Sequence, residues 1–295
     1  MKKYLVCLLV AASAPLMAQN TGVRGGATHP LTTPRRAAAT SGTSPALLGA
    51  EYLSILPHVV DGVGGGSGWT TQVVVTNTGQ DVENWEVDFY NDSNQAMAFS
   101  WVGYGLESYL AGTLNPGQSQ TFTTTGQTAG GTLVDGWGSL NSNSGGSISV
   151  YQVLVDSLPQ FLFASASSTL STFGIGGNTT QPGAIIPFDN TNGYVDGLAF
   201  TNPDSTNQYS SGDTLNVVVY DSNYNQLGSH QVTVAAGHKQ LVVMPTAWTE
   251  TANQKGSLYI TPQGTDFSPI TPLAFRFQYL NNAQSFITLP VLQYY

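Results

Sequence analysis

The fold of this chain is decided by a ten-residue stretch, GWTTQVVVTN (68–77), and by its echo, GYVDGLAFTN (193–202). Both stretches begin with Gly and an aromatic residue and end in Thr-Asn, with apolar β-branched or aromatic residues between. Such residues favour a strand, because their bulky side chains fit a pleated sheet better than a helix. The copies lie 125 residues apart, which indicates that one structural unit occurs twice.

Three further echoes follow in the same order along the chain. VDFYNDSNQ (87–95) corresponds to VVYDSNYNQ (218–226), LNPGQ (114–118) to VAAGH (234–238), and GSL (138–140) to GSL (256–258). Loops of different length explain why the offset drifts between 118 and 131 residues. We therefore expect two modules of one fold, joined near residues 174–183.

Strands are predicted throughout both modules. The segments are short, rich in Val, Thr and aromatic residues, and bounded by turn residues: 73–76, 85–90, 119–123, 148–154, 215–220, 231–234, 240–244, 257–261 and 273–279. Residues 91–94 and 221–225 are expected to form hairpin turns, since Asn and Asp tolerate left-handed backbone. No stretch shows a helical period, and only 8% of the residues are charged. The predicted fold class is all-β, with two tandem antiparallel β-sandwich modules of roughly 100 residues each.

The repeated motifs also resemble a known family. GWTTQVVVTN (68–77), the FYND turn (89–92), the NPG before an alternating strand (115–117) and GWGSL (136–140) look like tandem β-sandwich (Ig-like) repeats of exported bacterial proteins of unassigned function. The second module departs from this pattern, with Tyr194 in place of Trp69 and Lys255 near the position of Trp137. The resemblance implies a fold and export, and it supplies no catalytic residues.

The N-terminal part is expected to direct export. Lys2 and Lys3 precede a short apolar run, and Leu16-Met17-Ala18 forms a cleavage site, which is the pattern of a signal peptide. The predicted organisation is a signal peptide at 1–18, a flexible basic Pro/Thr/Ala-rich linker at 19–50, and β-sandwich modules at 51–178 and 179–295. No transmembrane segment is predicted, because the apolar run is shorter than the roughly 20 residues needed to span a bilayer. Cys7, the single cysteine, lies within the signal peptide.

Charge is unevenly distributed along the chain. Arg24, Arg35 and Arg36 make the linker basic, whereas residues 51–295 hold all 17 acidic residues and only three basic ones. So few basic side chains argue against a nucleic-acid partner, because phosphate binding depends on Lys and Arg. The linker is expected to be attracted to the acidic modules or to anionic envelope polymers, and salt should weaken that attraction.

The sequence lacks the usual patterns of an enzyme. No two of its four histidines have metal-ligand spacing, so no zinc site and no cofactor are expected. The glycine-rich stretch 62–68 matches neither a serine-hydrolase elbow nor a dinucleotide loop. Glu83, Glu86 and Asp88 are the nearest approach to the paired carboxylates of a glycosidase, but such acids more often form a solvated sheet face. We therefore expect a protein that is not an enzyme.

Calcium is a weaker alternative to a plain hairpin turn at one site. Asp221, Asn223 and Asn225 space oxygen atoms as a calcium loop does. The sixth position is Gln226 rather than Gly, and the twelfth is Val232 rather than Glu. The hairpin turn is the favoured interpretation.

Aromatic residues carry the remaining hint about ligands. Trp69 and Trp137 lie in predicted strands and are expected in the core, whereas Trp101, Tyr104 and Tyr109 lie in an insertion without an echo in the second module. An exposed loop of this composition could stack on sugar rings or bind an extracellular protein. The expected function is a non-enzymatic secreted or cell-surface protein with a structural or adhesive role. The alternatives are a carbohydrate-binding protein that uses this loop and, third, a glycoside-active enzyme.

Overall fold

The computed structural model describes residues 54–64, 67–127, 132–142, 148–158, 161–168, 183–203, 214–263, 270–280 and 283–294. These residues form an all-β protein, which confirms the predicted fold class. The predicted signal peptide (1–18), the basic linker (19–50) and the boundary between modules at 178/179 lie outside the described residues.

The described strands divide into two consecutive groups. The first comprises β1 (Ser54–Gly64), β2 (Ser67–Asn77), β3 (Glu83–Tyr90), β4 (Phe99–Trp101), β5 (Gly105–Glu107), β6 (Tyr109–Leu114), β7 (Ser119–Thr123), β8 (Val134–Ser142), β9 (Ile148–Leu158) and β10 (Phe161–Ser168). The second comprises β11 (Gly183–Asp189), β12 (Tyr194–Thr201), β13 (Thr214–Asp221), β14 (Gln226–Thr233), β15 (Lys239–Val243), β16 (Lys255–Pro262), β17 (Thr271–Leu280), β18 (Ala283–Leu289) and β19 (Leu292–Tyr294). Between β15 and β16 lie two short helices, α1 (Met244–Ala247) and η1 (Thr249–Thr251).

Strands 1–10, which we call the first half, form a sandwich. The layer β6-β3-β8-β1 faces the layer β7-β2-β9-β10, and β1 belongs to both because its end at Gly62–Gly64 also pairs with β2. Alternate residues of the strands point inward, so that Val73, Val87 and Leu140 meet in one buried cluster. This alternation is the pattern of an antiparallel sandwich whose faces differ in polarity.

Strands 11–19, the second half, repeat the same strand order. The layer β14-β13-β16-β11 corresponds to β6-β3-β8-β1, and β15-β12-β17-β18 corresponds to β7-β2-β9-β10. This half has its own buried cluster, which includes Ile186, Leu198, Val217 and Leu258. The equal strand orders support the prediction of two modules of one fold.

The echoed Thr-Asn motif ends the corresponding strands β2 and β12. Asn77 donates from Nδ2 to the carbonyl oxygen of Leu114 at 2.9 Å, and Asn202 donates from Nδ2 to that of Val234, also at 2.9 Å. Both asparagines are fully buried. A buried amide group must be hydrogen-bonded. Here the two asparagine side chains connect the ends of β2 and β12 to the ends of β6 and β14. This contact is a structural reason for the repeated Thr-Asn motif.

The two predicted hairpin turns are confirmed. The backbone N–H of Asn91 donates to the carbonyl of Gln95, and that of Asp221 donates to the carbonyl of Asn225, both at 2.9 Å. The left-handed residue has the same place in both turns: Asn94 has φ 60° and Tyr224 has φ 65°.

When the halves are matched from these turns, the register corrects two sequence echoes. Asn91 corresponds to Asp221, so residues 87–95 align with 217–225 rather than with 218–226. Tyr90 pairs with Trp137 and Tyr220 pairs with Ser257, so Gly256 corresponds to Gly136 rather than to Gly138. A shift of two residues keeps every side chain on the same face of a strand. For this reason the short GSL match could not reveal the correct alignment.

The predicted strands all fall in or next to observed ones. One boundary is wrong at Met244, which begins helix α1 rather than continuing β15, with Pro245 in the first turn. Proline suits the first turn of a helix but lacks the N–H that a central strand position needs. Trp137 is buried as expected, while Trp69 is only partly buried and packs where the two halves meet.

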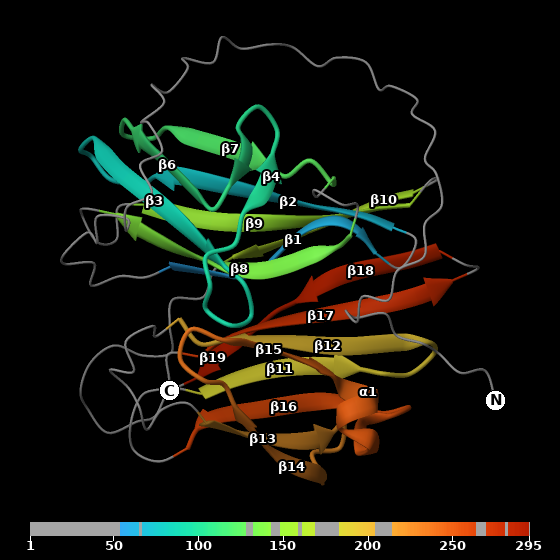
Figure 1. The fold of residues 1–295 in the computed structure, drawn as a ribbon. Helices are drawn as coiled ribbons and strands as arrows, with labels where there is room; N and C mark the ends of the chain where they lie inside the picture. The colour runs from blue at the N-terminus through green and yellow to red at the C-terminus, as the bar shows by residue number, and fades with distance from the viewer. Residues whose placement is uncertain are drawn as a thin grey trace.

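The two halves pack against each other directly. Figure 1 shows the sheet that contains β17 and β12 lying between the first half and the sheet β13-β16-β11. Val60 and Leu154 of the first half share a buried apolar cluster with Leu273, Phe275 and other residues of the second. We call this contact region the junction. Because both halves bury apolar surface there, neither is independent of the other.

Candidate functional site

The aromatic loop predicted to bind a ligand is not one exposed surface. Trp101 is only 1% exposed and lies in the core of the first half, with ring centroids 5.1 Å from Phe89. Tyr104 is half-buried and packs against Phe122, whereas Tyr109 is exposed on β6. The predicted exposure of Trp101 is therefore wrong, because strands β4 and β5 fold the loop back and the large ring gains more by filling the core. The structure does not bring Trp101, Tyr104 and Tyr109 together as a ligand surface.

The alternative calcium residues form the favoured hairpin turn. Oδ1 of Asp221 accepts the backbone N–H groups of Asn223 and Asn225, both at 2.8 Å, and Oδ2 accepts Nδ2 of Asn225 at 3.0 Å. These hydrogen bonds, that of the Asn225 side chain first, lower the pKa of Asp221. The carboxylate closes its own turn, as Asx turns do, and Asn91 does the same in the first half. Within the described ranges, no three His, Cys, Asp or Glu side chains gather as metal ligands would.

The paired carboxylates lie on the outward face of β3. Burial, followed by the negative charge of Glu86, raises the pKa of Asp88 to about 6, and the two side chains are in hydrogen-bond contact. Nδ2 of Asn141 donates to Asp88 at 3.2 Å, while Glu83 is buried at the start of the strand. Glycosidases keep their two carboxyl groups about 5–10 Å apart. Two carboxyl groups in hydrogen-bond contact lie closer together than this, so their arrangement does not favour glycoside hydrolysis.

A charged cluster is buried at the junction. The side chain of Lys239, at the start of β15, is 0% exposed; it forms ion pairs with Asp135 and Asp92 and donates to the carbonyl oxygen of Gly136 at 3.2 Å. Nδ1 of His58 lies 3.1 Å from the ammonium nitrogen. Burial, and then the charge of Lys239, lowers the pKa of His58 to about 3, so this ring is neutral near pH 7. Each hydrogen of the Lys239 ammonium group thus has an acceptor in the first half. We interpret the cluster as an electrostatic contact that holds the two halves together.

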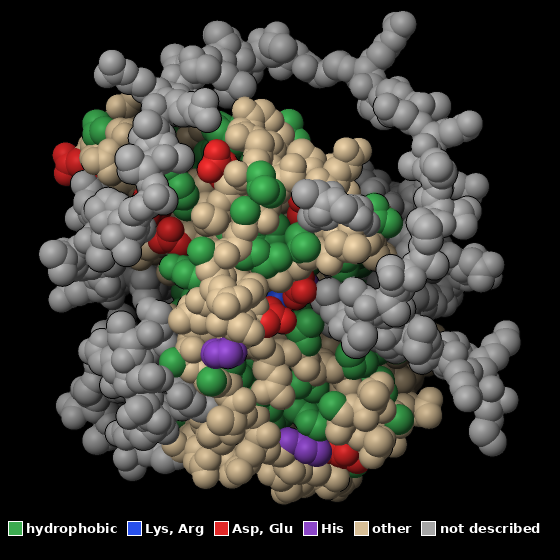
Figure 2. Space-filling view, viewed as in Figure 1, with side chains coloured by type: hydrophobic (Ala, Val, Ile, Leu, Met, Phe, Trp, Pro, Cys, Tyr) green, Lys and Arg blue, Asp and Glu red, His purple; other side chains and the backbone are tan. Residues whose placement is uncertain are grey.

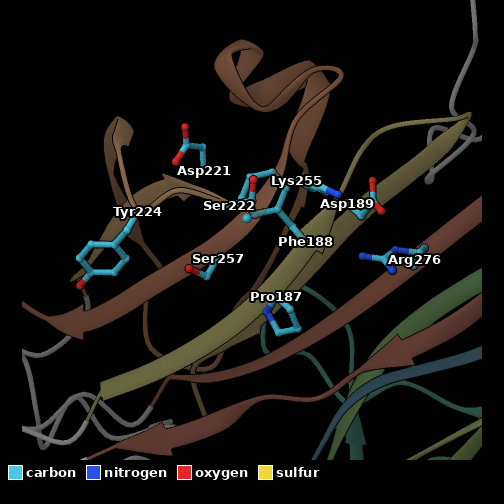
Figure 3. A pocket seen from close by; sticks show the side chains of 10 residues that line it. Pro187, Phe188, Asp189, Asp221, Ser222, Tyr224, Lys255, Ser257 and Arg276 are labelled. Carbon is cyan, nitrogen blue, oxygen red and sulfur yellow. The ribbon is translucent and has the colours of Figure 1, made fainter.

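A shallow hollow of about 440 Å³ opens at one end of the sheet β14-β13-β16-β11. Antiparallel register creates it: Asp189 ends β11 opposite Lys255, which begins β16, and Asp221 ends β13 opposite Gly256. Figure 3 shows Tyr224, Asp221, Lys255 and Arg276 arranged around the hollow, with Pro187 on its floor. Charged groups from the four strands β11, β13, β16 and β17 therefore converge on one open surface.

Tyr224 lines the hollow and packs against two further tyrosines. The rings of Tyr220 and Tyr224 are stacked, with centroids 4.5 Å apart and an angle of 5° between their planes. Tyr259 contacts both of them edge-on. Tyr224 is nevertheless 62% exposed, because only one face of its ring is covered. The other face is an aromatic surface open to solvent.

The two cations of the hollow are used differently. Arg276 is engaged by Asp196 through two hydrogen bonds, Nε–Oδ1 at 2.8 Å and Nη2–Oδ2 at 2.9 Å, and it lies 5.4 Å above the ring of Tyr194. Lys255 is exposed, and among the described residues its ammonium takes part in no ion pair. Arg276 is thus fixed in place, while Lys255 can reorient toward a bound molecule.

Sequence reasoning missed this hollow. Tyr220, Tyr224 and Tyr259 come from a strand, a turn and a more distant strand, so no local motif unites them. One signal was present, because the turn position of Asn94 in the first half holds Tyr224 in the second. A bulky aromatic residue where a left-handed backbone is required is uncommon and could have indicated a special role.

No family model, curated protein or solved structure matched the chain in comparisons with known proteins. The resemblance to tandem Ig-like modules therefore stays a prediction that rests on the quoted motifs. Among the described residues, no helix is both long enough and apolar enough to cross a membrane.

Proposed function

We propose that this chain is a non-enzymatic secreted or cell-surface protein with a structural or adhesive role. The observation that carries the proposal is the junction, where an apolar cluster and the buried Lys239 ion pairs fasten the two halves together. A structural or adhesive protein must hold its binding surfaces at fixed positions under load. Two sandwiches joined by a buried apolar cluster meet this requirement better than two domains joined by a linker alone.

The composition of the surface also supports this role. On the face shown in Figure 2, hydrophobic side chains are spread over the described surface, and charged side chains occur only at a few places. A surface of this kind is not dominated by charge repulsion and offers many hydroxyl and amide groups for hydrogen bonds. Polysaccharides and uncharged protein surfaces are suitable partners for it.

The experiment measures binding of the fluorescently labelled mature chain (19–295) to whole cells and to isolated envelope material. We expect saturable binding that a variant lacking residues 19–50 retains at physiological salt, since the modules supply the contacts. The same preparations are assayed for turnover of ester and glycoside substrates. Absence of surface binding at every salt concentration, or a turnover that Glu86→Gln abolishes, would contradict the proposal.

Carbohydrate binding is the second candidate function. The hollow beside Tyr224 favours it, because an exposed aromatic ring stands next to carboxylate, hydroxyl and ammonium groups. In this second candidate, the hollow takes the place of the predicted loop around Trp101 as the sugar-binding surface, because the Trp101 ring is buried.

A further inference from the structure

We propose that the hollow bounded by Tyr224 binds an uncharged glycan, with one pyranose ring stacked on the exposed face of Tyr224. The inference rests on the second candidate function above and gives it a site and a ligand class. It depends on three independent observations: the exposure of the tyrosine, the backbone conformation that holds it there, and the balance of charge in the hollow.

The exposed face of Tyr224 has the properties of a stacking platform. Tyr220 supports the ring from behind at 4.5 Å, and Tyr259 contacts both rings edge-on. Such packing restricts the ring's rotation, so little conformational entropy is lost when a ligand stacks on it. The C–H face of a pyranose is apolar and flat, and it fits an aromatic ring, while its hydroxyl groups point outward to polar partners.

The backbone of Tyr224 is held in a conformation that a tyrosine rarely adopts. Its φ of 65° lies in the left-handed region, where the equivalent turn of the first half has Asn94 at φ 60°. Asn or Gly would satisfy this turn with less steric strain. Strained residues that persist in a structure are concentrated at functional sites. Turn formation alone therefore does not require a tyrosine here, and the ring contacts with Tyr220 and Tyr259 hold an exposed aromatic face beside the hollow.

The charges around the hollow indicate an uncharged ligand. Asp189, Asp221, Lys255 and Arg276 line the hollow. Asp196 already pairs with Arg276, so these groups carry no excess of positive charge, and the whole chain has a formal charge of −9. A strongly acidic glycan would be repelled by the rest of the protein. Lys255 can donate to sugar hydroxyls, and the outward oxygen atoms of the carboxylates can accept from them.

The shape of the hollow points to part of a chain rather than to an enclosed small molecule. Its walls come from strand ends and a hairpin, and no described element covers it (Figure 3). An open site of this kind lets a long polymer pass across the surface with one or two sugar units in contact. The affinity per site is then modest, in the millimolar to micromolar range typical of small contact areas.

The test uses the mature chain and isothermal titration calorimetry with cellohexaose, mannohexaose and chitohexaose as probes. We expect at least one probe to bind with a millimolar or tighter Kd. Tyr224→Asn should weaken binding at least 10-fold with little change in the melting temperature, since Asn relieves the left-handed strain but gives up the ring contacts with Tyr220 and Tyr259. Tyr224→Phe retains the stacking face and should keep the affinity within about 3-fold.

The matched control is Tyr109→Asn, which removes another exposed tyrosine on the first half and should leave sugar binding unchanged. The proposal is overturned if none of the three probes binds, if Tyr224→Asn binds as tightly as the wild type, or if only an oligogalacturonate or a peptide library yields binding dependent on Tyr224. A wild-type protein that binds none of the sugars but adheres normally to cells would reject this site and leave the adhesive function standing.

Discussion

A buried ammonium group loses its hydration, and Lys239 must recover that free energy from its partners. It does so through Asp135 and Asp92, which come from the first half. A buried ion pair is weak evidence for stability as such, but removal of one partner leaves the other charge uncompensated. Lys239 therefore has more influence on whether the halves stay together than on the stability of its own half.

Replacement of Lys239 with Met should destabilise the protein by about 3–5 kcal/mol, because Asp135 is left buried without a cation. The double variant Lys239→Met/Asp135→Asn should recover a large part of that loss, since the remaining group is neutral. Urea denaturation of both variants measures the free energy of unfolding. A double variant as unstable as the single one would show that shape, and not charge, explains the position of Lys239.

At the scale of the element, strand β16 pairs with the end of β13 at Gly256. A Cβ atom placed on Gly256 would lie 1.9 Å from the carbonyl oxygen of Tyr220, and one on Gly136 would lie 2.2 Å from that of Tyr90. Both contacts involve backbone atoms, which cannot move away by a change of rotamer as a flexible side chain can. Glycine is therefore required at the same place in each half so that the hairpin can close onto the neighbouring strand.

We expect Gly256→Ala to cost roughly 1–3 kcal/mol through overpacking and displacement of the backbone. The neighbouring substitution Ser257→Ala lies in the same strand and should change the stability by less than about 0.5 kcal/mol. Thermal unfolding followed by circular dichroism provides the comparison. Equal stabilities of the two variants would mean that the backbones of β13 and β16 can shift at this point at almost no cost in stability.

At the scale of the whole molecule, the junction should make the two halves unfold together and make this unfolding sensitive to acid. His58 is neutral in the folded protein because burial and Lys239 lower its pKa to about 3, whereas in the unfolded chain its pKa has the ordinary value of 6.5. Between these two values the unfolded state binds more protons than the folded state. The contribution of His58 to stability is therefore fully present above pH 6.5 and is lost as the pH falls toward 3.

The expected loss is roughly 3 kcal/mol on passing from pH 7 to pH 4, from 1.36 kcal/mol per pH unit. His58→Gln removes the titrating ring and should flatten this part of the stability curve, while His29→Gln in the predicted linker should leave it unchanged. Urea titrations between pH 4 and pH 7.5 measure both slopes. Identical slopes for His58→Gln and the wild type would contradict the assigned protonation state, and two separate transitions at pH 7 would contradict the shared junction.

Local sequence features determined the all-β class, most of the strands and both hairpin turns. These follow from residue preferences and from Asn or Asp side chains that bond to backbone groups only two to four residues away. The echoes at 68–77 and 193–202 likewise reflect a requirement within each half, the buried amides of Asn77 and Asn202. Information of this kind is contained in a short stretch of sequence, so it can be interpreted without knowing how the rest of the chain folds.

Only the tertiary structure decided which side chains meet. It buried Trp101, exposed Tyr224, and placed Lys239 next to His58, which lies 181 residues earlier. Burial and ion pairing depend on which strands become neighbours across two sheets and a junction, and residue preference carries almost no information about partners so far apart. The sequence by itself therefore determined which secondary-structure elements this protein contains. Long-range packing decided where its charged side chains are buried and paired, and where an aromatic ring stays exposed to solvent.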